Sequence, residues 1–338
     1  MPSPSSFVMK PPCHLLITLT VIALTSTQPV AAETWVSIAP LPEPNAGFAA
    51  GWVNGKLVIA GGTNWPEGVK RWLNKTWVYN PGTNQWTPGP DLPHPLAYGA
   101  GASDGQQLWI AGGADGKMAR NEVLALTKEG SWQHVGTMNH HVAFSGGAFM
   151  EGSLWIYGGT PDPDDWKQVT TALSSVSTSG KASNENPLRR EGPGIGLPAV
   201  VGSGRKVYAF TGAWMSTENG QVQNSAEAAA YDIASKTWTK LDPYPVSARG
   251  VAAVALDDQH IYLAGGYGTD EQGFLDAAWI HDVRTQQYRK ALPLPIKALV
   301  CLVKGGDGFI YVLGGEDQKK HRSAACFRIP VAALLKEE

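Results

Sequence analysis

The sequence lacks a net charge of either sign. Its 27 lysines and arginines nearly balance its 29 aspartates and glutamates, and the formal net charge of the 338 residues is −2. No basic block or stripe interrupts the chain, so a nucleic-acid partner is not indicated. A small, neutral or mildly charged ligand suits this composition better.

Long amphipathic helical stretches are also missing. The chain is 43% hydrophobic and contains 39 glycines, 24 prolines and 13 tryptophans. This composition indicates one sizeable all-β domain.

Several catalytic and metal-binding patterns are missing as well. No Gly-x-Ser-x-Gly nucleophile elbow occurs, and the glycine-rich segment 192–196 has Pro193 where a phosphate loop needs backbone donors. His140 and His141 would point to opposite faces of a strand, and no other His or Cys stands at a chelating spacing. We therefore expect neither a metal nor another cofactor.

Cysteine is rare, with three in the whole chain. Cys13 precedes the domain, whereas Cys301 and Cys326 fall in the first and third strands of the last predicted repeat. Two strands separated by a third lie roughly 9.6 Å apart, and a disulfide needs Cα atoms within about 7 Å. We therefore expect free, buried thiols.

The long apolar run near the N-terminus is too short to cross a bilayer comfortably. Lys10 precedes apolar residues 15–25, and Val30-Ala31-Ala32 offers the small residues that a signal peptidase prefers. We expect residues 1–32 to be a signal peptide and residues 33–338 to form the domain. The protein would then be exported, to the periplasm or outside the cell.

One phrase recurs six times: an apolar strand that ends in Gly-Gly, or once in Thr-Gly, followed by a polar loop. The Gly pairs begin at positions 61, 112, 158, 211, 265 and 314. A period of about 51 residues is typical of the four-stranded blades of kelch repeats. The sequence therefore predicts an all-β, six-bladed kelch β-propeller.

An aromatic residue at the expected outer strand confirms the period in most repeats: Trp86, Trp132, Trp238 and Tyr288. The third repeat lacks one. Trp35 precedes the first Gly pair, so we expect an N-terminal strand containing Trp35 to complete the last blade and close the ring. We expect these aromatics and the Gly pairs to be scaffold.

Loop length predicts the functional face. Connections between the first and second strands of each repeat are tight turns, whereas those between the second and third strands are longer and chemically varied. Successive connections of an antiparallel blade alternate between faces. The long loops and the blade-to-blade connections therefore share one face, where the mouth of the central channel is the expected ligand site.

Three phrases in the first two blades carry a family resemblance: Gly61-Gly62-Thr63-Asn64-Trp65-Pro66, Lys70-Arg71-Trp72 and Pro95-Leu96-Ala97-Tyr98-Gly99. They are similar to the opening of the kelch-type sialic-acid mutarotases, the N-acetylneuraminate epimerase family. The blade order resembles the circularly permuted branch of that family. The resemblance implies a sugar-acid isomerase that interconverts the α and β anomers of N-acetylneuraminate by ring opening, without a cofactor.

In that family a Glu directly after a Gly, with an Arg six residues further on, is the proposed catalytic pair. Gly315-Glu316 and Arg322 match this pattern. The resemblance implies that Glu316 shuttles protons and that Arg322 clamps the substrate carboxylate. Residues 318–321 replace the Pro-Gly turn usual in the family, so the direction of Arg322 depends on the path of this loop.

Further substrate-binding candidates lie on the same face. Trp65 and Tyr98 could pack on the sugar, beside Asn64 in the first long loop. Arg71, Arg189 and Arg249 are alternative partners for the carboxylate. The sequence predicts a small-molecule sugar acid as ligand and leaves the oligomeric state open.

Two other classes of function remain. A noncatalytic kelch module would bind a glycan or a protein without accelerating anomer exchange. A copper radical oxidase on a kelch scaffold needs a Tyr joined to a Cys and two His ligands. The strand positions of Cys301 and Cys326 and the lack of a suitable His pair disfavour it.

Overall fold

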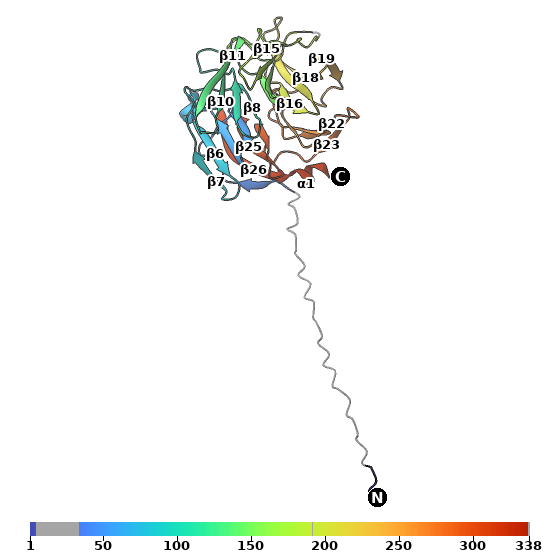
Figure 1. The fold of residues 1–338 in the computed structure, drawn as a ribbon. Helices are drawn as coiled ribbons and strands as arrows, with labels where there is room; N and C mark the ends of the chain where they lie inside the picture. Colours follow the sequence, from blue (N-terminus) through green and yellow to red (C-terminus); the bar gives the residue numbers. More distant parts are fainter. Residues whose placement is uncertain (5–33, 191, 337–338) are drawn as a thin grey trace. The chain divides into compact units, whose positions relative to one another are not determined.

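The computed structural model describes residues 1–4, 34–190 and 192–336, so residues 5–32 of the predicted signal peptide lie outside the described part. The described residues from 34 onward form six four-stranded antiparallel sheets arranged around a central axis (Figure 1). The prediction of an all-β, six-bladed propeller is confirmed.

Each of the first three blades takes its four strands from consecutive segments, listed here from the axis outward. They are β2 (Ala49–Val53), β3 (Lys56–Ala60), β6 (Thr76–Asn80) and β7 (Gln85–Pro88); β8 (Ala100–Ser103), β9 (Leu108–Ala111), β10 (Arg120–Leu126) and β11 (Trp132–Val142); β12 (Gly146–Met150), β13 (Ser153–Tyr157), β14 (Leu173–Ser177) and β15 (Ala182–Asn184).

The last three blades follow the same order, and the final one is completed from the N-terminus. They are β16 (Ala199–Ser203), β17 (Lys206–Met215), β18 (Val222–Asp232) and β19 (Thr237–Leu241); β20 (Ala252–Ala255), β21 (His260–Ala264), β22 (Ala278–Asp282) and β23 (Tyr288–Ala291); β24 (Leu299–Lys304), β25 (Phe309–Gln318), β26 (His321–Pro330) and β1 (Val36–Ile38). The first long loop adds a small hairpin of β4 (Thr63–Asn64) and β5 (Arg71–Trp72) around a 3-10 turn, Pro66–Gly68.

The ring is closed as predicted. Strand β1 pairs with β26, with Val36 opposite Arg328 and Ile38 opposite Cys326. The prediction for Trp35 is wrong by one position, because Trp35 lies immediately before β1. Its indole packs against the fifth blade, where Nε1 donates to the carbonyl of Pro293 at 2.7 Å and the ring centroid lies 6.4 Å from that of Tyr262.

The outer aromatics link each blade to the preceding one. Trp132 donates from Nε1 to the carbonyl of Pro90 at 3.0 Å, and Trp238 does so to Asn186 at 2.9 Å. Trp86 reaches the carbonyl of Ala39 at 2.9 Å. These side chains therefore fill space between blades and satisfy a carbonyl of the neighbour, which is the expected scaffold role.

The Gly pairs occupy conformations that other residues rarely adopt. Gly62 has φ +102°, and a Cβ there would lie 2.0 Å from Oδ1 of Asn45. The strand therefore ends so close to the neighbouring blade that only glycine fits without a shift.

Backbone hydrogen bonds tie neighbouring blades together at the long-loop end of the axis. The amide of Tyr98 donates to the carbonyl of Gly47 at 2.7 Å, that of Phe144 to Tyr98 at 2.8 Å, and that of Leu197 to Phe144 at 2.7 Å. The amide of Gly250 likewise donates to the carbonyl of Leu197 at 3.2 Å. Tyr98, Phe144 and Leu197 all have positive φ, which these bonds hold in place.

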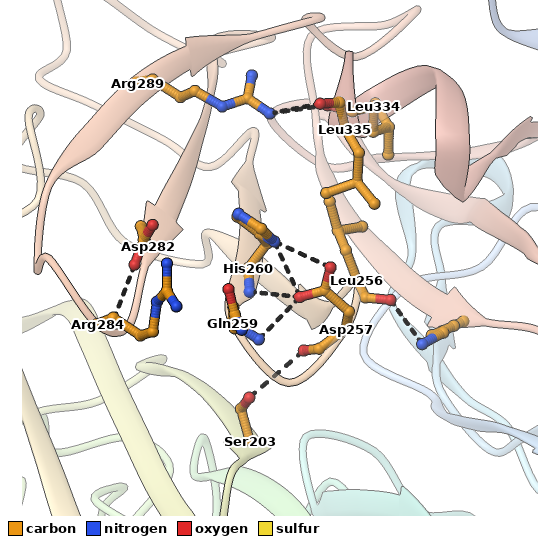
Figure 2. Close-up of polar contacts among 11 residues, drawn as sticks. Ser203, Leu256, Asp257, Gln259, His260, Asp282, Arg284, Arg289, Leu334 and Leu335 are labelled. Carbon is orange, nitrogen blue, oxygen red and sulfur yellow. Dashed lines mark hydrogen bonds and ion pairs between the residues drawn. The ribbon is translucent and has the colours of Figure 1, made fainter. Parts of the chain in front are cut away.

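Figure 2 shows one of the short turns, between β20 and β21, and contacts around it. In the turn before β21, Asp257 accepts hydrogen bonds from the amides of Gln259 and His260, both at 2.8 Å. The chain ends in a short helix, α1 (Val331–Leu335), whose carbonyls at Leu334 and Leu335 accept from Arg289 at 3.3 Å. This contact fastens the C-terminal segment to the fifth blade (Figure 2).

The two cysteines of the domain are free, as predicted. Both face Leu313 of the intervening β25, so they share one row of the last blade. Cys326 is buried, whereas Cys301 is partly exposed as a residue although its thiol is desolvated. Burial raises the pKa of the Cys301 thiol to about 12 and that of Cys326 to about 11. Both sulfurs are therefore protonated and poorly nucleophilic at neutral pH.

Candidate active site

Two adjoining cavities open at the long-loop end of the propeller axis. The central cavity, of about 360 Å³, is lined by residues of all six blades, among them Gly47, Tyr98, Phe144, Leu197, Gly250 and Leu299. A side cavity of about 370 Å³ is lined by residues of blades three to six. Leu197, Leu299 and Glu316 border both, so Glu316 stands where the two cavities meet.

Glu316 and Arg322 face each other across the hairpin of β25 and β26. Their closest atoms, Glu316 Oε2 and Arg322 Nη1, are 3.0 Å apart. The two differ in access to solvent, since 29% of the Glu316 side chain is exposed but only 3% of the Arg322 side chain. Glu316 can therefore reach a ligand, whereas Arg322 lies behind it.

Each of the three nitrogens of the Arg322 guanidinium has a partner. Nε donates to Oγ1 of Thr63 at 3.3 Å, Nη1 to the carbonyl of His321 at 3.1 Å, and Nη2 to the hydroxyl of Tyr98 at 3.3 Å. Tyr98 and Thr63 in turn share a hydrogen bond of 3.1 Å between their hydroxyls. Arg322 thereby fixes Glu316, Tyr98 and Thr63 relative to one another, and a buried guanidinium needs such partners.

The path of residues 318–321, which replace the family's Pro-Gly turn, determines the direction of Arg322. Gln318 pairs with His321, so Lys319 and Lys320 form a two-residue hairpin turn, and Lys320, its second residue, has a left-handed φ of +59°. His321 Nδ1 contacts Asp317 Oδ1 at 2.6 Å. Alternation along β26 then turns Arg322 to the opposite side from His321, toward Glu316.

Aromatic rings form the wall on the side of the first three blades. The ring centroids of Trp72 and Tyr98 are 5.6 Å apart, those of Tyr98 and Phe144 4.5 Å, and those of Phe144 and Trp166 5.1 Å. Lys70 Nζ lies 4.5 Å from the ring centroid of Trp72. Such a wall offers flat apolar surface with a cation at its edge.

Arg249 lies in the wall of the side cavity. Its Nη1 donates to Oδ1 of Asn224 at 2.9 Å, and its guanidinium carbon lies 4.4 Å from the ring centroid of Tyr267. Asn224 is itself held by donating to the carbonyl of Gly268 at 2.6 Å. Burial lowers the pKa of Arg249, while nearby Tyr267, Asp270 and Glu316 act in the opposite direction.

The other predicted site residues lie farther out. Asn64 donates from Nδ2 to Oε2 of Glu43 at 3.1 Å, and Trp65 has its ring centroid 6.0 Å from the guanidinium carbon of Arg322. Arg71 and Arg189 are exposed and line neither the central nor the side cavity in the described part of the chain. The structure thus brings Glu316, Arg322 and Tyr98 together and sets Arg249 at the adjoining cavity.

Sequence reasoning missed Phe144, Trp166, Asn224 and Tyr267. Phe144 carries a signal that repeat alignment could have found, since Val142-Ala143-Phe144 stands in the same place as Leu96-Ala97-Tyr98 of the preceding blade. Trp166, Asn224 and Tyr267 come from loop and strand ends whose convergence depends on the tertiary structure.

The described residues offer no candidate metal site and no membrane-spanning helix. No group of three or more His, Cys, Asp or Glu in residues 34–190 and 192–336 is placed to hold a metal ion. Within the same ranges, no helix has the length and apolar character needed to cross a membrane.

Comparison with known proteins supports the repeat and the fold. The family model described as "Kelch motif" matches residues 44–93, the first blade. Kelch-like protein 36 of Bos taurus is 22% identical over 280 residues, which cover 81% of this chain and 45% of the relative. A solved structure titled "Structure of YjhT" has a TM-score of 0.67 at 15% identity and covers 76% of this chain and 87% of its own.

A further relative matches over a shorter region. N-acetylneuraminate epimerase of Haemophilus influenzae is 29% identical over 117 residues, which cover 28% of this chain and 31% of that protein. The chain thus spans less than half the length of these two curated relatives. Together the comparisons show a kelch motif on a propeller fold.

Proposed function

We propose that this protein accelerates the interconversion of the α and β anomers of N-acetylneuraminate. The observation that carries the proposal is the position of Glu316, an accessible carboxylate at the junction of two cavities, held from behind by a buried arginine. The aromatic wall of Tyr98 and Phe144 faces the same space. Similarity to an N-acetylneuraminate epimerase supports this assignment.

The chemistry requires one proton to move between two oxygens on the same carbon. Glu316 accepts the proton of the anomeric hydroxyl and passes it to the ring oxygen while the bond from that oxygen to the anomeric carbon breaks. The open form is a 2-keto acid. After rotation about the adjacent bond, the freed hydroxyl attacks the other face of the carbonyl and the proton returns by the reverse path. The carboxylate ends unchanged, as general acid and base catalysis requires.

The surrounding residues have supporting roles. The flat faces of Tyr98 and Phe144 can pack on the apolar side of the pyranose and on the acetamido methyl group. Arg322 holds the Glu316 carboxylate in one orientation, which limits the number of geometries from which proton transfer begins. Neither role needs a cofactor.

Replacing Glu316 by Gln tests the proposal. Glu316→Gln keeps the shape and the hydrogen bonding of the side chain but cannot accept a proton. We expect anomer exchange to slow by roughly 10²- to 10⁴-fold. The measurement is NMR exchange between α- and β-N-acetylneuraminate at a pH where spontaneous mutarotation is slow.

Glu67→Gln is the matched control, because Glu67 is an exposed carboxylate in the first long loop and its loss changes the charge equally. We expect this variant to retain wild-type exchange. If the wild-type protein binds the sugar but leaves exchange at the background rate, the protein is a noncatalytic binding module, the function that its similarity to kelch-like proteins favours. Fast exchange that survives Glu316→Gln would reject Glu316 as the acid and base.

A further inference from the structure

Arg249 lines the side cavity and is more accessible to a ligand than Arg322. Arg322 has all its nitrogens engaged and only 3% of its side chain exposed, so a substrate carboxylate could reach it only if Glu316 moved away. Arg249 is partly exposed and lines the cavity that Glu316 borders. The two arginines of this site therefore differ in what they can contact.

The shape of the ligand requires a cation close to the acid and base. In a 2-keto sugar acid the carboxylate carbon is bonded to the anomeric carbon, which also carries the hydroxyl and the ring oxygen that exchange the proton. A group that binds the carboxylate must therefore lie beside Glu316. Arg249 meets this condition, because both residues border one cavity of about 370 Å³.

The supports of Arg249 hold its guanidinium in one plane. Nη1 is bound by Asn224, and the planar group stacks on Tyr267 at 4.4 Å. Asn224 is anchored by the carbonyls of Tyr267 and Gly268 at 3.2 and 2.6 Å. A guanidinium ordered in this way loses little conformational freedom when it forms two parallel bonds to a carboxylate.

The other charges around the side cavity are largely paired. Asp270 accepts from the hydroxyl of Tyr267 at 2.8 Å and lies 3.5 Å from Lys319 Nζ. Glu316 is paired with Arg322 at 3.0 Å. Lys319 also lines the cavity and adds positive charge at its exposed edge. Arg249 has a neutral hydrogen-bond partner and an aromatic neighbour. The carboxylates of Asp270 and Glu316 act on it electrostatically, but they are paired with Lys319 and Arg322, so the guanidinium keeps donors for an anion.

We propose that Arg249 binds the carboxylate of the sugar acid and that Arg322 is a positioning residue for Glu316. The proposal rests on the proposed function for the identity of the substrate. It assigns the pyranose to the central cavity, the carboxylate to the side cavity, and the anomeric carbon to the point where Glu316 borders both.

The test compares N-acetylneuraminate with its neutral 1-carboxamide. Dissociation constants of both are measured by calorimetry at one ionic strength, and folding of each variant is checked by its thermal transition. We expect wild type to prefer the acid, and Arg249→Gln to weaken binding of the acid by about 10- to 100-fold while binding of the amide changes little. Arg249→Lys keeps the charge without the planar fork, so we expect an intermediate preference.

Two further variants separate the roles. Arg71→Gln removes the same charge from an exposed position on the same face, and we expect it to keep the preference for the acid. Arg322→Lys should also keep that preference but lower the exchange rate at saturating substrate, because Glu316 loses its fixed partner.

The outcomes distinguish this inference from the proposed function. A preference for the acid that disappears in Arg249→Gln supports the inference even if exchange stays at the background rate, in which case only the enzymatic function fails. If Arg322→Lys abolishes the preference and Arg249→Gln does not, the inference is overturned. Equal wild-type affinity for acid and amide, or affinity for neither, also overturns it.

Discussion

Thr211 stands where the other five blades have the first glycine of a pair. Its φ is +57°, a conformation that is rare for a β-branched residue. The side chain is 3% exposed, and its hydroxyl has no hydrogen-bond partner among the described residues. Thr211 therefore combines backbone strain with an unsatisfied polar group.

We expect Thr211→Gly to raise the free energy of unfolding by about 1 kcal/mol. Relief of the left-handed conformation contributes about 1 to 2 kcal/mol, and removal of the unsatisfied hydroxyl about 1 to 3 kcal/mol. Lost packing and the greater freedom of glycine in the unfolded chain offset part of this gain. The midpoint of urea unfolding measures the difference.

The reverse substitution in the next blade is the matched comparison. Gly265 has φ +72°, and a Cβ there would lie 2.6 Å from the carbonyl oxygen of Ala298, so we expect Gly265→Thr to lower the midpoint. A lower midpoint for Thr211→Gly would show that packing of the threonine side chain outweighs the strain.

Strand β1 is the element that joins the ends of the chain. It contributes three residues to the last blade, and the indole of Trp35 beside it bonds to the fifth blade. Ala39, just after β1, accepts from Trp86 and donates to Oδ1 of Asn84, both at 2.9 Å. This short segment thus connects the last blade to both of its neighbours.

We expect a chain that begins at residue 40 to melt at a lower temperature than one that begins at residue 33. Removal of β1 exposes the edge of β26 and breaks the links to the first and fifth blades, so the ring opens. Differential scanning calorimetry of both chains measures the effect. Equal melting temperatures would show that the ring does not depend on strand closure.

At the scale of the whole molecule, His281 lies buried at the interface of the fourth and fifth blades. Its ring centroid is 4.7 Å from that of Tyr288, 5.6 Å from Phe210 and 6.3 Å from Tyr208. Neither ring nitrogen has a hydrogen-bond partner in the described residues. Burial lowers the pKa of His281 from 6.5 to about 4, although Asp282 and Asp242 act in the opposite direction.

We expect His281 to make the propeller less stable in mild acid. The unfolded chain binds a proton at this residue below about pH 6.5, whereas the folded protein resists it until about pH 4. Stability is therefore constant above pH 6.5 and falls by up to about 3 kcal/mol as the pH drops to 4. His281→Phe, which fits the aromatic surroundings, should remove the share of this slope that His281 contributes, while His140, whose pKa burial also lowers, keeps its own share.

Urea unfolding at a series of pH values checks this expectation. His134→Gln is the control, because His134 is exposed and its loss should leave the slope in place. Carboxylates contribute below about pH 5: burial would raise the pKa of Asp115, but the amides of Met118 and Lys117 and the side chain of Arg120 lower it to about 2. The comparison is therefore made between pH 6.5 and 5, and an equal slope there in wild type and His281→Phe would contradict the assignment.

Much of the architecture could be predicted because it depends on a repeated local pattern. A Gly pair ends a strand only where the backbone needs positive φ close to a neighbour, and an aromatic recurs where one blade covers the next. These requirements repeat with the period of the blade, so they can be recognised in the amino-acid sequence alone. The error at Trp35 is of one residue, because strand ends depend on pairing partners as well as on local sequence.

The site was predictable only in part. Glu316, Arg322 and Tyr98 were selected through the family resemblance, and the repeat pattern predicted only that their segments lie on the long-loop face. Their relative exposure was not predictable, because it depends on Thr63 and Tyr98 from other blades closing over the guanidinium of Arg322.

The sequence by itself determined the number of blades, the closing strand, the free thiols and the face that carries the long loops, since each follows from spacing along the chain. Only the tertiary structure decided which arginine is buried and which borders a cavity, and it alone brought Asn224 and Tyr267 to Arg249. The physical reason is that a cavity wall is assembled from loops of several blades. The conformation of each of these loops depends on contacts with residues distant in sequence.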